Sequence, residues 1–184
     1  GGVLHAQRLR KIPDVVIGDL DSIDQSVLTL LEKKKVKIIR HLREKDMTDG
    51  ELAIQYALEK GCQEVVIVGI LGDRVDHFSA NLMYLAKLSE RYTIRIIEND
   101  QDVFFVRKAI EILGTKGDEV SLIPILGDCH GVSTTGIQYS LEDAPLLCGS
   151  TQGISNVMLA KSARVQVARG VLMVVHRILK ERDF

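Results

Sequence analysis

The sequence of 184 residues contains no tryptophan, and aromatic residues make up only 4% of it. A core must therefore be built mainly from Val, Ile and Leu, and a hydrophobic fraction of 46% supplies enough of them. No uninterrupted apolar run approaches the roughly 18 residues that a membrane-spanning helix needs, so we expect no membrane partner. The net charge of −1 gives no reason to expect a nucleic-acid partner. An anionic substrate would need local cations or a metal.

Cysteine is also scarce, and the three residues present are widely spaced. Cys62, Cys129 and Cys148 form no C-x-x-C pair, which argues against a zinc site or a disulfide framework. Unpaired cysteines favour a reducing compartment, so we expect a cytoplasmic protein.

The first half of the chain alternates short apolar runs with helical patterns. Strands are expected at 15–17, 36–39, 64–68 and 93–97, and helices at 23–34, around 52–58 and at 76–89. This alternation is typical of right-handed βαβ units, and it predicts a mostly parallel, Rossmann-like α/β domain.

From about Phe104 the pattern changes to short alternating stretches separated by Gly, Asp and Ser. Such a pattern is typical of an antiparallel β-sandwich or barrel. The change of period near residue 108 predicts two domains, an α/β domain over residues 1–107 and a β-rich domain over residues 108–184.

Acidic residues gather in three segments, each directly after an expected strand. Ligands of open α/β sheets bind outside the carboxyl ends of the strands, so this placement predicts a site. The first segment is Gly18-Asp19-Leu20-Asp21-Ser22. In an extended loop Asp19 and Asp21 would point the same way and suit Mg²⁺. A turn with Asp21 or Ser22 as a helix N-cap is the alternative.

The second and third segments follow the next two strands. The second is Lys45-Asp46-Met47-Thr48-Asp49-Gly50-Glu51. An acid-rich helix start explains this segment about as well as a metal and phosphate site does. The third is Gly69-Ile70-Leu71-Gly72-Asp73-Arg74-Val75-Asp76-His77. Its glycines let a ligand approach the backbone, and a helix N-terminus follows to receive an anion. Arg74 suits phosphate oxygens, and Asp76 could reach a metal or orient Arg74 or His77. The alternative is Asp76 as an N-cap beside a surface His77.

Carboxylates gathered at one sheet edge repel each other unless a cation neutralises them. A divalent metal with a polyphosphate meets this need, so the residues by themselves predict a Mg²⁺–nucleotide phosphotransfer or phosphohydrolase site. No Walker sequence or kinase signature set is present, so the phosphate site must be built another way. A non-catalytic nucleotide-binding protein and a structural scaffold with ordinary capped loops stay open as alternatives.

Ordered motifs along nearly the whole chain resemble those of thiamine pyrophosphokinases. In the first half they are Pro13-Asp14…Gly18-Asp19-Leu20-Asp21-Ser22, Lys45-Asp46-x-Thr48-Asp49-x-Glu51-x-Ala53 and Gly72-x-Arg74-x-Asp76-His77…Asn81. In the second half they are the segments 118–124, 131–137 and Gly153-Ile154-Ser155-Asn156.

The resemblance implies a homodimer with an ATP-binding α/β domain, a β domain, and thiamine bound at the dimer interface. It implies Mg²⁺-dependent transfer of a pyrophosphoryl group from ATP to the thiamine hydroxyl, with release of AMP. The implied metal ligands are Asp19, Asp21, Asp46 and Asp76; the catalytic residues are Asp49, Arg74 and Asp76; the nucleotide contacts are Gly18, Thr48, Gly72, His77 and Asn81; the thiamine contacts are Ser155 and Asn156. Either Asp49 or Asp76 would accept the hydroxyl proton.

The family normally opens with a strand and an acidic Asp-Gly-Gly stretch before the helix that precedes Pro13. Gly1-Gly2 would be the end of that stretch, so the resemblance implies that this sequence lacks the first strand of the α/β domain.

Overall fold

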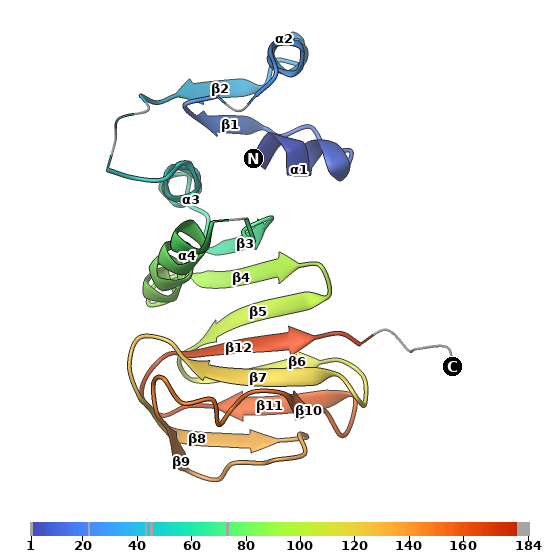
Figure 1. The fold of residues 1–184 in the computed structure, drawn as a ribbon, viewed down its shortest axis with the longest axis vertical. Coiled ribbons are helices and arrows are strands. Elements are labelled where there is room, and N and C mark those ends of the chain that lie inside the picture. Colours follow the sequence, from blue (N-terminus) through green and yellow to red (C-terminus); the bar gives the residue numbers. More distant parts are fainter. Residues whose placement is uncertain (1, 22, 43, 45, 73, 180–184) are drawn as a thin grey trace. The chain divides into compact units, whose positions relative to one another are not determined.

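The computed structural model describes residues 2–21, 23–42, 44, 46–72 and 74–179. Its elements follow the chain in the order α1 (Gly2–Arg8), β1 (Val15–Gly18), α2 (Gln25–Lys33), β2 (Lys37–Arg40), α3 (Asp49–Glu59), β3 (Glu64–Val68), α4 (Val75–Leu88), β4 (Thr93–Glu98), β5 (Gln101–Val106), β6 (Ala109–Leu113), β7 (Glu119–Pro124), β8 (Cys129–Thr135), β9 (Ala144–Leu146), β10 (Asn156–Val157), β11 (Ser162–Gln166) and β12 (Leu172–Arg177) (Figure 1). The chain divides into two compact units, over residues 1–63 and 64–184.

The first unit contains a parallel pair of strands, β1 and β2, which are hydrogen-bonded along their whole length. Val16 of β1 is buried, as are Leu28 and Leu31 of α2 and Leu52 of α3. These apolar side chains are the reason why the two helices form, because short helices in water depend on the packing of an apolar face. The Asp24 carboxylate caps α2 by accepting a hydrogen bond from the Ser26 N–H.

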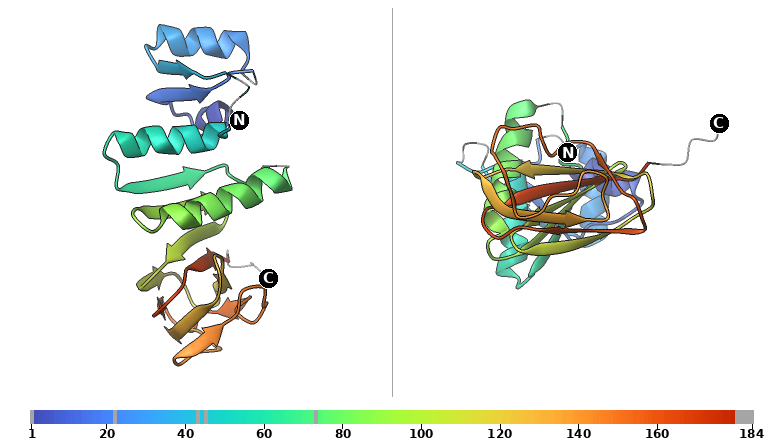
Figure 2. Two further views of the ribbon diagram at one scale, coloured as in Figure 1. Left: turned by 90° about the vertical axis from the view of Figure 1, so that its left-hand side faces the viewer. Right: turned by 90° about the horizontal axis from the view of Figure 1, so that it is seen from below.

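The second unit contains a six-stranded sheet in the order β10-β7-β12-β5-β4-β3 and a four-stranded sheet in the order β6-β11-β8-β9. In the larger sheet only β3 and β4 run parallel, and α4 lies beside β4 (Figure 2). One core joins the two sheets. It takes Val106, Val120, Leu122, Leu172 and Val174 from the larger sheet, and Ile112, Cys129, Val132, Leu146, Ala163 and Val165 from the smaller one.

The expected order of an α/β half followed by a β-rich half is confirmed by the order of the helices and strands along the chain. The strand expected at 64–68 is β3, and the strand expected at 93–97 lies within β4. The change to antiparallel pairing comes early, at the tight turn between β4 and β5. Asn99 takes a φ of 53° there, a left-handed conformation that asparagine tolerates and that two-residue hairpin turns require. None of the described helices has both the length and the apolar character needed to cross a membrane.

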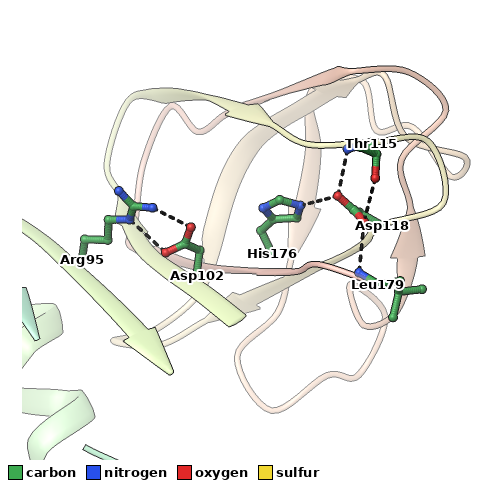
Figure 3. Close-up of polar contacts among 6 residues, drawn as sticks. All are labelled: Arg95, Asp102, Thr115, Asp118, His176 and Leu179. Carbon is green, nitrogen blue, oxygen red and sulfur yellow. Dashed lines mark hydrogen bonds and ion pairs between the residues drawn. The ribbon is translucent and has the colours of Figure 1, made fainter. Parts of the chain in front are cut away.

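A buried carboxylate ties together the turn after β6 and the end of β12 (Figure 3). Asp118 and His176 are 1% and 2% exposed, and Asp118 Oδ2 lies 3.0 Å from His176 Nε2. The carboxylate also accepts hydrogen bonds from the Thr115 N–H (2.8 Å), the Thr115 hydroxyl (3.1 Å) and the Leu179 N–H (3.1 Å). Burial opposes its charge, but these four hydrogen bonds outweigh burial and hold the pKa of Asp118 below its usual 3.8.

Replacing this carboxylate by an amide should destabilise the fold. Asp118→Asn is expected to lower the free energy of unfolding by about 1–3 kcal/mol at pH 7, because a single amide oxygen replaces two acceptor oxygens. Urea unfolding measures this loss. Since the folded-state pKa is depressed, the carboxylate stabilises fully above about pH 4, and its contribution is lost as the pH falls further. The difference between wild type and variant should therefore shrink in acid. Equal stability at pH 7 would contradict the assignment.

Candidate functional site

In the first unit, the end of β1 and the start of α3 meet at Gly18 and Asp49. Gly18 has a φ of 148°, which strains any side chain, and a Cβ placed on it would lie 2.7 Å from Asp49 Oδ2. Any side chain here would have to displace the Asp49 carboxylate and adopt a strained φ, so glycine is favoured. The first and second acidic segments, expected at neighbouring strand ends, are therefore brought together here.

The Asp19–Asp21 segment is a turn, which corrects the expectation of an extended loop. Leu20 takes a φ of 65°, and the Asp21 N–H donates to Asp19 Oδ1 at 3.1 Å. Asp19 is half-buried and Asp21 is exposed. The alternative is confirmed in its turn, but Asp21 is not the N-cap, because Asp24 caps the helix that follows. Ser22 lies outside the described residues.

The second segment begins α3 in the way that an acid-rich helix start predicts. Thr48 is the N-cap, and its hydroxyl accepts a hydrogen bond from the Glu51 N–H at 3.1 Å. Asp49 lies in the first turn, where the helix dipole favours negative charge. Its Oδ1 atom is buried, whereas Asp46 is exposed before the helix. Lys45 lies outside the described residues.

A cavity of about 300 Å³ adjoins the meeting point of β1 and α3. Gly18, Asp19 and Asp49 contribute its polar lining, and side chains such as Val15 and Ile23 contribute its apolar lining. A mostly apolar cavity with a few converging polar groups is the usual form of a small-molecule site.

In the second unit, the third segment leads into α4. Arg74 is the N-cap residue and makes no side-chain capping bond. Its guanidinium donates to Asp76 through Nε (3.2 Å) and Nη2 (2.5 Å). That pairing, with the His77 N–H, holds the pKa of Asp76 below its usual value. Asp76 lies in the first turn of the helix, so its expected alternative as an N-cap is wrong. Asp73 lies outside the described residues.

The remaining residues expected at the nucleotide lie along the same segment. Gly72 and His77 are exposed, and Asn81 is half-buried, further along α4. The exposed first turn of α4 has no capping bond from its N-cap side chain, and apart from the His77 N–H, which donates to Asp76, its backbone N–H groups suit an anion.

The Ser-Asn pair of the β-rich half joins two segments that are distant in sequence. Asn156 is buried, and its side-chain amide forms two hydrogen bonds with the Tyr139 backbone. Its Oδ1 accepts from the Tyr139 N–H at 3.0 Å, and its Nδ2 donates to the Tyr139 C=O at 2.8 Å. Ser155 is exposed with a φ of 56°, and its N–H donates to Ser121 Oγ. Asn156 therefore holds the loop, while Ser155 stays accessible.

The predicted metal ligands divide between the units, with Asp19, Asp21 and Asp46 in the first and Asp76 in the second. Within the described ranges, no three His, Cys, Asp or Glu side chains gather closely enough to hold a metal ion. Mg²⁺ commonly takes only one or two carboxylates and completes its shell with water and substrate phosphates. The oxygen donors Asp19 and Asp49 at one cavity fit that chemistry.

Sequence reasoning missed Glu98, the last residue of β4. Its Oε2 accepts a hydrogen bond from the Ile70 N–H in the glycine loop after β3, at 3.1 Å. One sign of this residue's role was visible in the sequence, because Glu98 directly follows the strand expected at 93–97, where site residues of an α/β sheet are found.

Comparison with known families accounts for this two-part arrangement. Residues 1–97 match the family described as thiamin pyrophosphokinase, catalytic domain. Residues 92–172 match the family described as thiamin pyrophosphokinase, vitamin B1 binding domain. The chain belongs to the thiamine pyrophosphokinase family.

Several similar proteins are named thiamine pyrophosphokinase. The chain is 32% identical to thiamine pyrophosphokinase of Bacillus subtilis, over 89% of this chain and 78% of that protein. It is 26% identical to thiamine pyrophosphokinase 1 of rice, over 86% of this chain but only 64% of that protein. A crystal structure of the enzyme from Bacillus subtilis superposes with a TM-score of 0.86 at 28% identity, covering 97% of this chain and 85% of the other.

The close approach at Gly18 can be tested by adding one methyl group. Gly18→Ala should lower the free energy of unfolding by about 1–3 kcal/mol, because the methyl displaces the Asp49 carboxylate and the backbone φ is strained. Gly50→Ala is the matched control, since its methyl would meet no atom closer than 3.9 Å. Urea unfolding compares the two. If both variants were equally stable, the approach would not be a constraint.

Proposed function

We propose that this protein is a thiamine pyrophosphokinase, which transfers a pyrophosphoryl group from ATP to the hydroxyl of thiamine and releases AMP. The observation that carries the proposal is that one chain matches the catalytic and the vitamin B1 binding domain, in order, over residues 1–172. The chain spans 64% to 78% of the length of the curated relatives named above, so the activity is proposed for the protein to which this sequence belongs.

The acidic residues are proposed to hold Mg²⁺ together with the ATP phosphates. Asp19, Asp21, Asp46 and Asp76 would supply carboxylate oxygens, and the bound ion would neutralise charge on the transferring group. The cavity lined by Gly18, Asp19 and Asp49 supports this role. Catalysis of this kind depends on positioning and on charge stabilisation, so the chain need not form a covalent bond to the substrate.

Phosphate oxygens are proposed to meet Arg74 and the start of α4, with Thr48, Gly72, His77 and Asn81 as further nucleotide contacts. The Arg74–Asp76 pair is exposed on both sides, with 65% and 64% of the side chains accessible. Exposed ion pairs contribute little to stability, so a phosphate can recruit Arg74 at small cost. The uncapped first turn of α4 adds backbone donors.

Asp49 is the better candidate to accept the proton of the thiamine hydroxyl. The pKa of Asp76 is lowered, chiefly by its hydrogen bond to Arg74, and a lowered pKa makes a carboxylate a weaker base. Asp49 lies at the cavity instead, against the backbone of Gly18.

We assign residues 1–107 to a Rossmann-like nucleotide domain and residues 108–184 to a β-sandwich that binds thiamine through Ser155 and Asn156. The parallel β3–β4 pair beside α4 supports the first assignment. The shared core, whose buried members other than Val106 all lie after residue 107, supports the second, while the larger sheet runs through both and the compact units divide between residues 63 and 64.

A cytoplasmic homodimer with thiamine at its interface completes the proposal. Exposed apolar side chains in the β-rich half support an interface, and they include Leu126, Tyr139, Leu147, Ile154 and Leu159. The three cysteines are free, which suits a reducing compartment.

Product analysis tests the reaction. With ATP, Mg²⁺ and thiamine, the full-length protein should form AMP and thiamine diphosphate in equal amounts, and chelation of the metal by EDTA should stop both. Chromatography of the nucleotides and thiamine esters measures this. Formation of ADP with thiamine monophosphate would instead identify a simple phosphotransferase, and ATP hydrolysis without a thiamine ester would identify a hydrolase.

Two aspartate variants test the metal assignment. Asp21→Asn and Asp76→Asn should each lower kcat by about 100-fold or more, since each loses a charge that holds the metal and phosphates. Glu59→Gln, at the far end of α3 from Asp49, is the matched control and should leave kcat unchanged. Circular dichroism and initial rates compare the variants. Full activity of both aspartate variants would refute the assignment, and a protein inactive in every form would favour a binding homologue.

A further inference from the structure

The glycine loop after β3 leaves the sheet beside the last residue of β4. β3 and β4 run parallel, and their paired register ends with Val68 opposite Ile97. The next residues are Gly69, with a φ of 70°, and Glu98. The left-handed turn at Gly69 directs the following backbone out of the strand, where the ladder offers it no further partner.

Glu98 supplies the missing acceptor. Its Oε2 lies 3.1 Å from the Ile70 nitrogen, and both residues are half-buried. Among the described residues, no Lys or Arg forms an ion pair with Glu98, so its interaction with the loop is not shared with a cation. A hydrogen bond from a backbone N–H to a carboxylate is stronger than one between neutral groups, especially away from water.

The contact is linked to Arg74 and Asp76 by the loop that precedes them in the chain. The loop runs from Gly69 to Gly72 and delivers Arg74 and Asp76 at the start of α4. By accepting from the Ile70 N–H, Glu98 ties the first part of the loop to the end of β4.

We propose that Glu98 is a positioning residue for pyrophosphoryl transfer, which fixes the Gly69–Gly72 loop to β4 and thereby places Arg74 and Asp76. The expected effect on kcat rests on the proposed function. The attachment of the loop to β4 does not depend on it. Loss of the contact should lower kcat and weaken MgATP binding while thiamine binding is unchanged, because a small misplacement of reacting groups is costly.

The test compares Glu98→Ala with the conservative Glu98→Gln and with Glu64→Ala, a control at the opposite end of the β3–β4 pair. Glu98→Ala should lower kcat by about 10-fold or more, whereas Glu98→Gln, whose amide oxygen still accepts from Ile70, should stay within about 3-fold of wild type. Glu64→Ala should match wild type. The thermal midpoint of unfolding separates positioning from a general loss of stability. In the positioning role, Glu98→Ala loses kcat while its thermal midpoint stays close to that of wild type.

A second measurement does not depend on turnover. Amide hydrogen exchange of Ile70, followed by NMR, should be slow in wild type and Glu98→Gln and fast in Glu98→Ala. Fast exchange in wild type would overturn the contact. Fast exchange in Glu98→Ala with unchanged kcat would overturn the positioning role. If no variant, wild type included, transferred pyrophosphate while the exchange pattern held, the proposed function would fail and the fixed loop would stand.

Discussion

The contact between Gly18 and the Asp49 carboxylate is the constraint on which the proposed site depends. A Cβ on Gly18 would lie 2.7 Å from Asp49 Oδ2, so the end of β1 and the start of α3 pack closely at this point. Two acidic segments thereby reach one cavity, to whose lining Asp19 and Asp49 both contribute negative charge. We propose that a divalent ion bound together with a polyphosphate balances these charges.

Carboxylates elsewhere in the chain serve a different purpose. Asp118 is surrounded by donors and holds a turn to the end of β12, and Glu98 accepts a single backbone N–H. Both have protein partners for their charge. Asp21 and Asp46 are exposed. Among the proposed metal ligands, Asp76 is paired with Arg74 and Asp19 accepts from the Asp21 N–H, so position in the strand-end loops, and not the lack of a partner, is what the four share.

Part of this arrangement could be predicted from the sequence. β3 was predicted to the residue because Val/Ile runs between turn residues mark a strand, and the acidic segments stood out because three of them follow strands. The N-cap of α2 was missed, since several Asp and Ser residues compete for that position and local packing decides between them. The Ile70–Glu98 contact could not be predicted, because it depends on β3 and β4 being neighbours in register, 28 residues apart.

The central claim is that these loops bind a divalent metal only together with the nucleotide. Mn²⁺ takes the same octahedral oxygen sites as Mg²⁺, and equilibrium dialysis across a membrane that passes the analogue counts the ions that the protein itself retains, apart from those bound to the analogue in solution. The most direct measurement is a Mn²⁺ titration with and without a non-hydrolysable ATP analogue, in wild type and in Asp19→Asn. The account predicts tight binding by wild type with the analogue, weak binding without it, and weak binding by Asp19→Asn in both conditions. Equal binding by wild type and Asp19→Asn in the presence of the analogue would contradict it.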